Sequence, residues 1–110
     1  MEENKTLKVD MDWIPPRNYI LLYKLLIHKV VEWFSKVKIE KIRVYKSRSG
    51  EGLHFYIYLD KSLEDEERLI LQFLLGDDRN RCKLNWQSIQ IGMNDWNKFY
   101  RYYEYKLVKI

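Results

Sequence analysis

The sequence predicts an α+β domain of the ferredoxin-like type, with a four-stranded antiparallel sheet and helices on one face. Segments that alternate apolar and polar side chains, as half-buried strands do, are separated by longer segments with apolar residues at helical spacing. Their order along the chain is βαββα(α)β. The simplest closure of that order, the split βαβ arrangement, makes the first and third strands neighbours.

Four segments are expected to form the strands: 6–12, 38–47, 53–60 and 98–110. The last is assigned by its aromatic and β-branched content. Alternation places one apolar set under the helices: Val9, Met11, Leu53, Phe55, Ile57 and Leu59. It places a polar and aromatic set on an open face: Asp10, Asp12, Arg43, Tyr45, His54, Tyr56 and Tyr58.

A first helix is expected over 17–36, opened by Pro16 or Asn18. It is apolar around most of its circumference, and its narrow polar stripe consists of Lys24, His28 and Glu32. So wide an apolar arc implies deep burial, or burial partly against a second subunit, and a homodimer is therefore compatible with the sequence.

Two further helices are expected after the third strand. Ser62 with Asp65 has the spacing of a capping box, and Gly76 has the place of a C-terminal glycine. A short third helix covers 77–92. The residues around its start are expected to cap it and to pair with one another at the surface: Asp77, Asp78, Arg79 and Arg81. The alternative is that Arg79 and Arg81 bind phosphate.

Length, composition and charge indicate one soluble globular domain. The 110 residues suffice for a single core, and 46% hydrophobic with 33% charged residues argues against disorder. The net charge of +4 is compatible with an anionic partner without requiring one. The lone Cys82 cannot form an internal disulfide, so a reducing cytoplasm is the expected compartment. No basic and apolar leader begins the chain, no segment is apolar enough for a membrane span, and the Lys and Glu content suits a thermophile.

Asp10 and Asp12 are candidate metal ligands. Carboxylates are uncommon within strands, and the i, i+2 spacing puts this pair on one face about 7 Å apart. That separation would let them hold one or two divalent ions such as Mg²⁺ or Mn²⁺. The alternative is a solvated or Lys/Arg-paired couple near the end of a strand.

The aromatic side chains of the open face are a candidate surface for single-stranded DNA or RNA. Tyr45, Tyr56 and Tyr58, with Arg43 and Arg48 nearby, have the composition of a base-stacking platform. Lys46 is expected to contribute to the same nucleic-acid-binding surface. His54 could donate to a phosphate or bind a metal. The alternatives are ordinary strand residues, or aromatic rings covered by a partner or by the C-terminal segment.

The turn "SRSGEG", residues 47–52, is either a simple hairpin turn or an anion-binding nest. Its backbone N–H groups and two hydroxyls, with Lys46 and Arg48, are the ingredients of such a nest. It lacks the order of a Walker A loop, and no helix follows it.

The motif "VDMD" followed by "SGEGLHFYIYL" resembles the first two motifs of the archaeo-eukaryotic primase superfamily. The resemblance implies an RNA-recognition-motif-like sheet, Asp10 and Asp12 as ligands of catalytic metals, and His54 as a nucleotide contact. The third motif of that family carries another aspartate, where this chain offers Asn85 in "KLNW", and Asp60 or Glu104 are the acidic residues that could take its place. Nearly the whole chain, including "LGDDRNR", also resembles small uncharacterised proteins of archaeal viruses, plasmids and genomes.

Three functions are therefore expected as alternatives. The leading one is a single-stranded nucleic-acid or nucleotide-binding domain, serving replication or repair in an archaeon or archaeal mobile element. The second is a minimal metal-dependent nucleotidyl-transfer or nuclease domain with Asp10 and Asp12 as ligands. The third is a non-catalytic viral protein-interaction module, which would use the apolar helix and the aromatic tail.

Overall fold

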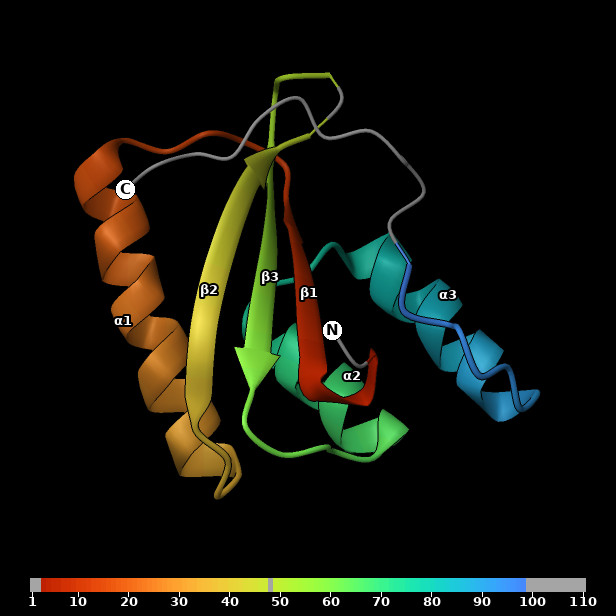
Figure 1. The fold of residues 1–110 in the computed structure, drawn as a ribbon. Helices are drawn as coiled ribbons and strands as arrows, with labels where there is room; N and C mark the ends of the chain where they lie inside the picture. The colour runs from red at the N-terminus through yellow and green to blue at the C-terminus, as the bar shows by residue number, and fades with distance from the viewer. Residues whose placement is uncertain (1–2, 48, 99–110) are drawn as a thin grey trace.

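A computed structural model describes residues 3–47 and 49–98 of the chain. A short 3₁₀ turn, Glu3–Lys5, leads into three strands and three helices (Figure 1). They follow in the order β1 (Thr6–Met11), α1 (Arg17–Phe34), β2 (Ile39–Lys46), β3 (Leu53–Leu59), α2 (Asp65–Leu74) and α3 (Arg79–Gln90).

The strands form one antiparallel sheet in the order β1-β3-β2, with β3 in the centre. Its register confirms the alternation that the sequence predicts. Val9 and Val44 flank Phe55 on one face, whereas Asp10 and Tyr45 flank His54 on the other. Because partners across a sheet share a face, the apolar and polar sets lie on opposite sides.

The core lies between the apolar face of the sheet and two helices, α1 at the left of the sheet and α2 behind it in Figure 1. Ile20, Ile27 and Val31 of α1 are buried against the strands, together with Leu71 of α2. The Tyr23 hydroxyl donates to the Leu75 carbonyl and ties α1 to the end of α2. A smaller cluster of Leu69, Cys82 and Trp96 joins α2 to α3.

The prediction of a four-stranded ferredoxin-like sheet is wrong: between residues 3 and 98 the sheet has three strands. In the predicted topology the fourth strand would pair with the outer edge of β1. Here side chains occupy that edge, since Lys8 N–H donates to Gln72 Oε1 (2.9 Å) and Asp10 N–H donates to Asp77 Oδ1 (2.7 Å). Arg81 Nη1 in turn donates to the Lys8 carbonyl at 3.1 Å.

These three contacts satisfy backbone groups that an edge strand otherwise leaves unpaired. They explain why α3 lies beside β1 in Figure 1 rather than over a face of the sheet, so the predicted placement of the helices also needs correction. The expected fourth strand, 98–110, lies outside the described residues except for its first residue.

The predicted element boundaries need small corrections. The helix α2 begins at Asp65, and its capping box is Glu64 with Glu67 rather than Ser62 with Asp65. The reason is that Leu63 packs against the core and donates its N–H to the Asn4 carbonyl, which keeps the chain extended there.

Both later helices end where the glycines predict, since Gly76 and Gly92 have φ values of +87° and +80°. The first strand ends at Met11, so Asp12 lies in the bend that follows rather than in the strand.

Candidate nucleic-acid interface

The polar face of the sheet brings Asp10, His54 and Tyr45 into one row across the three strands. The outward N–H of Asp10 puts the Asp10–His54 pair at a position where no backbone hydrogen bonds link the strands, and side chains lie closest there. The Asp10 Oδ1 and His54 Nε2 atoms are 3.6 Å apart. His54 is only 3% exposed, so it lies below the surface rather than on an open face.

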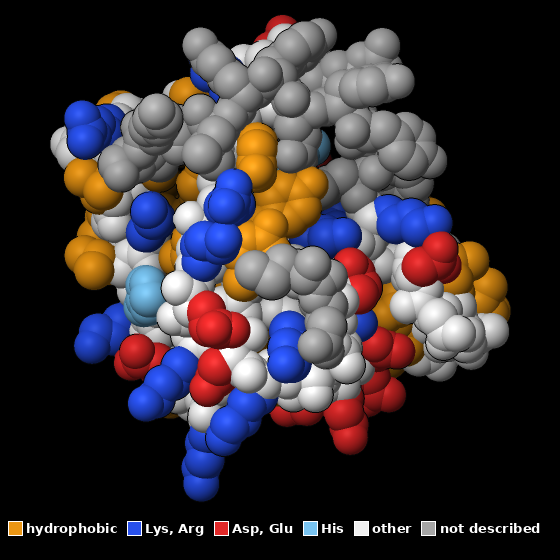
Figure 2. Space-filling model, in the orientation of Figure 1, with side chains coloured by type: hydrophobic (Ala, Val, Ile, Leu, Met, Phe, Trp, Pro, Cys, Tyr) orange, Lys and Arg blue, Asp and Glu red, His pale blue; other side chains and the backbone are white. Residues whose placement is uncertain are grey.

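The next two rows carry the tyrosines and basic residues. Lys8, Tyr56 and Arg43 are aligned across the sheet, and the following row contains Thr6, Tyr58 and Lys41. We call the half-buried or exposed members that lie on β2 and β3 the tyrosine face: Lys41, Arg43, Tyr45, Tyr56 and Tyr58. Figure 2, which views the molecule from this side, shows Lys and Arg side chains beside an apolar and aromatic patch over the sheet.

The rings of the tyrosine face contact one another. Tyr45 and Tyr56 meet edge to face with centroids 5.6 Å apart. Tyr56 and Tyr58 are near parallel, at 11° between planes and 6.4 Å between centroids. Lys41 Nζ lies 5.6 Å from the centre of the Tyr58 ring, within the range of a cation–π contact. The surface therefore combines π faces with two cations on β2.

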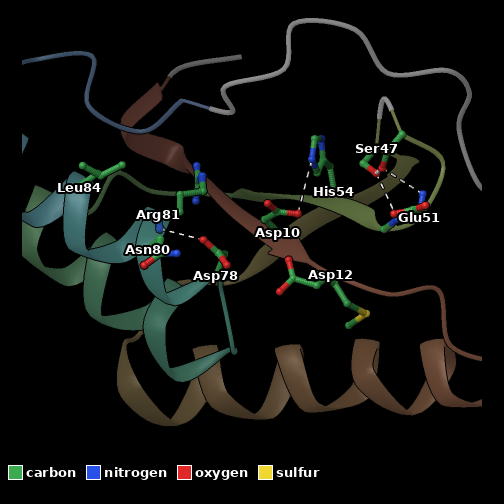
Figure 3. Close-up of a pocket in the computed structure, with 12 residues that line it drawn as sticks. Asp10, Asp12, Ser47, Glu51, His54, Asp78, Asn80, Arg81 and Leu84 are labelled. Carbon is green, nitrogen blue, oxygen red and sulfur yellow. Dashed lines mark hydrogen bonds and ion pairs between the residues drawn. The ribbon is translucent and has the colours of Figure 1, made fainter.

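A cavity of about 380 Å³ adjoins the tyrosine face at the Asp10–His54 end (Figure 3). We call it the acidic cavity because its lining includes four carboxylates: Asp10, Asp12, Glu51 and Asp78. The strand β1, the turn before β3 and the start of α3 each contribute to its wall. The sequence prediction that Asp10, Asp12 and His54 lie near one another therefore agrees with the geometry.

The electrostatics of the acidic cavity act most clearly on Asp10. Burial raises the pKa of the Asp10 carboxyl, and the negative charges of Asp12 and Asp78 raise it further. His54 and Arg81 lower the same pKa, but burial is the largest cause. Asp10 thus holds a proton to higher pH than an exposed aspartate does.

Arg81 lines the cavity but acts as a structural residue. It forms a 2.5 Å ion pair with Asp77, and their side chains are 3% and 0% exposed. Its guanidinium also donates to Asn97 Oδ1 at 2.8 Å and to the Lys8 carbonyl. The expected surface pairing is therefore wrong for Arg81, because the pair is buried, whereas Asp78 caps α3 as predicted by accepting from Arg81 N–H at 2.9 Å.

The residues of the acidic cavity do not fit a preformed metal centre. Within residues 3–47 and 49–98, no three Asp, Glu, His or Cys side chains are grouped so that they could hold a metal ion. Asp10 is close to His54, whereas Asp12 belongs to the bend after β1. The expectation of Mg²⁺ or Mn²⁺ at Asp10 and Asp12 therefore has two carboxylates in its favour, and the described residues do not add a third side chain to form a metal-binding group.

In the turn between β2 and β3, three backbone N–H groups donate hydrogen bonds to oxygen atoms of the same turn. Gly52 N–H donates to Ser47 Oγ at 3.1 Å, Glu51 N–H to Ser49 Oγ at 3.2 Å, and Gly50 N–H to the Ser47 carbonyl at 2.9 Å. These groups build a hairpin turn rather than the anion nest that the sequence allowed.

The two basic residues next to this turn are not part of the tyrosine face as the structure describes it. Lys46 is paired with Leu53, so the register puts it on the apolar face of the sheet. Arg48 lies outside the described residues.

Sequence reasoning did not identify Lys41 as part of the tyrosine face, nor Glu51 and Asp78 as part of the wall of the acidic cavity. Lys41 alternates with Arg43 and Tyr45, so the period of two could have placed it on the same face. Lys8 shares that face too, but its ammonium group is held by the Asn97 carbonyl (2.8 Å) and by Glu3.

Comparisons with known proteins give a distant viral relative. The chain is 26% identical over 115 aligned residues to "Uncharacterized protein 30" of Sulfolobus islandicus filamentous virus, isolate Iceland/Hveragerdi. The match covers 96% of this chain but 40% of that protein. No family model and no solved structure matches the chain. The expected resemblance to archaeal viral proteins is thus supported, whereas the primase likeness depends on the motif residues alone.

None of the helices that the structure describes has both the length and the apolar content needed to cross a membrane.

Proposed function

We propose that this chain binds single-stranded nucleic acid on the tyrosine face, in the replication or repair of an archaeal virus or related mobile element. The observation that carries the proposal is the alignment of three tyrosines with two cations on adjacent strands: Tyr45, Tyr56, Tyr58, Lys41 and Arg43.

The tyrosine face matches the two needs of a single strand. Tyrosine rings give each unstacked base a π face, worth about 1–3 kcal/mol per base, and they do so for any sequence. Lys41 and Arg43 lie on β2 beside Tyr58 and Tyr56 and give the phosphates a cationic border. Residues two apart on a strand are separated by about 7 Å, so the surface has room for two or three bases.

The acidic cavity would orient a bound single strand on the tyrosine face. Its four carboxylates repel phosphates from the Asp10 end, so the sugar-phosphate backbone follows the Lys41–Arg43 border instead. A base near Tyr45 meets carboxylate oxygens, which accept hydrogen bonds from the N–H groups on base edges. The metal-dependent alternative needs ligands that the described part of this cavity does not bring together.

The test is a fluorescence anisotropy titration of labelled single-stranded DNA, single-stranded RNA and duplex DNA. Tyr56→Ala or Tyr58→Ala is expected to raise the Kd for single strands by roughly 5- to 150-fold, as a loss of about 1–3 kcal/mol requires. Trp86→Ala is the matched control, because Trp86 is an exposed aromatic residue on α3, away from the sheet. Equal affinities for wild type and both tyrosine variants would exclude the tyrosine face.

A further inference from the structure

The outward side of α1 carries an unusually large apolar surface. Four of its leucine and aromatic side chains are among the most exposed in the described residues: Leu22 (62%), Leu25 (63%), Leu26 (47%) and Trp33 (81%). Tyr19 is a further 43% exposed and stands at the start of the same helix. Together with Lys29, most of these residues line an apolar hollow of about 390 Å³ on the surface of α1. Isolated exposed apolar residues are ordinary, but a continuous patch of this kind marks an interaction surface.

The spacing of these residues is that of a helix-pairing seam. Positions 19, 22, 26, 29 and 33 follow one another at intervals of three and four, as the a and d positions of a heptad repeat do. This seam lies on the side of α1 opposite Ile20, Ile27 and Val31, which are buried in the core. The helix thus has one apolar face for its own sheet and a second for another helix.

We propose that two copies of this chain associate through their α1 seams, with the helices antiparallel. An antiparallel alignment that sets Leu22 against Leu26 of the second copy also sets Lys29 against Tyr19 of the second copy. The leucines then form the centre of the interface, and the lysine lies over a tyrosine ring at each end, where its aliphatic stem covers apolar surface. The seam is therefore complementary to itself under a two-fold axis, which a twofold-symmetric dimer interface requires.

The area agrees with a stable dimer. With roughly 200–250 Å² of surface for each large apolar residue, the exposed fractions of the four apolar seam residues and of the adjacent Leu25 correspond to on the order of 650 Å² per copy. A standard protein interface buries about 800 Å² per partner. Flanking residues such as the exposed Glu32, which borders the seam, supply the remainder.

This inference does not rest on the proposed function, because α1 and the tyrosine face lie on opposite sides of the sheet. Dimerisation through α1 leaves both tyrosine faces outward. The dimer would then present two separate surfaces for nucleic acid.

The mass in solution tests the proposal. Light scattering behind size exclusion is expected to give twice the 13.7 kDa chain mass for wild type, and one chain mass for a Leu22→Glu, Leu26→Glu double variant. Ile91→Glu is the matched control, because Ile91 is 77% exposed at the end of α3 and should leave the dimer intact. Circular dichroism and cooperative thermal unfolding establish that each variant is folded.

Disulfide trapping tests the orientation. A mixture of Leu22→Cys and Leu26→Cys chains is expected to cross-link rapidly on oxidation, whereas each variant alone is expected to cross-link slowly. Rapid cross-linking of Leu22→Cys with itself would indicate parallel helices and overturn the antiparallel arrangement. A folded wild-type monomer at about 100 μM would overturn the dimer and leave the seam to a different protein, such as a host partner.

Discussion

The buried pair Asp77–Arg81 predicts a large loss of stability when Asp77 is removed. The two side chains are 0% and 3% exposed and 2.5 Å apart, so Asp77→Ala leaves the Arg81 guanidinium charge in the interior without its carboxylate. Removing one partner of a buried ion pair costs about 3–5 kcal/mol. The Asp10 N–H, which donates to Asp77 Oδ1 at 2.7 Å, also loses its acceptor at the edge of β1. A buried donor without a partner adds about 1–3 kcal/mol, so the total loss of unfolding free energy is roughly 4–8 kcal/mol.

The assay is equilibrium unfolding in urea, with the thermal midpoint as a second measurement. A loss of this size should lower the Tm of a 110-residue domain by on the order of 15–35 °C. Asp77→Asn keeps an oxygen acceptor for the Asp10 N–H but loses the charge, so its effect should be smaller than that of Asp77→Ala. Asp95→Ala is the control, because it breaks an exposed ion pair with Lys98 and should change the Tm little.

Equal stability of the Asp77→Ala and Asp95→Ala variants would refute this reasoning. If Asp77→Ala and Asp95→Ala unfold at the same urea concentration with the same slope, the ion pair does not stabilise the edge of β1. Side chains along that edge would then no longer account for the three-stranded sheet.

Two further predictions concern the wall of the acidic cavity. Asp10→Asn should raise the Tm at pH 7 and match wild type below about pH 3.8, the ordinary pKa of an aspartate. The reason is that the raised folded-state pKa of Asp10 stabilises the fold only while Asp10 is protonated. This contribution to stability is lost as the pH rises through the folded-state pKa. A Tm difference between Asp10→Asn and wild type that stays constant from pH 3 to 7 would contradict this prediction. Gly52→Ala should lower the free energy of unfolding by at least about 1 kcal/mol, because a Cβ there would lie 2.4 Å from the Met11 carbonyl oxygen, whose backbone must then move. Urea unfolding measures this loss, and an unchanged midpoint would mean that the turn relaxes without cost.

The sequence predicted the two faces of the sheet because their signal is local. A period of two along 6–12 and 53–60 is enough to separate Val9 and Phe55 from Asp10 and His54, whatever the rest of the chain does. Neighbouring first and third strands then brought Asp10 and His54 together, and the register bears this out.

The number of strands could not be predicted because it depends on long-range side-chain contacts. Gln72, Asp77 and Arg81 are polar residues that a sequence pattern places at the surface, and their burial follows only from the position of α3 beside β1. The i, i+4 spacing of Asp77 and Arg81 indicates a pair but does not tell whether it is buried.

The central claim is that the tyrosine face binds single strands, and the salt dependence of binding by wild type and Tyr58→Ala tests it most directly. Two phosphate contacts, at Lys41 and Arg43, predict a slope of roughly −1.4 for log K against log salt. Tyr58→Ala should lower the affinity at every salt concentration and leave the slope unchanged, since it removes stacking and no charge. A slope near zero, or a Tyr58→Ala titration that overlays that of wild type, would contradict the claim.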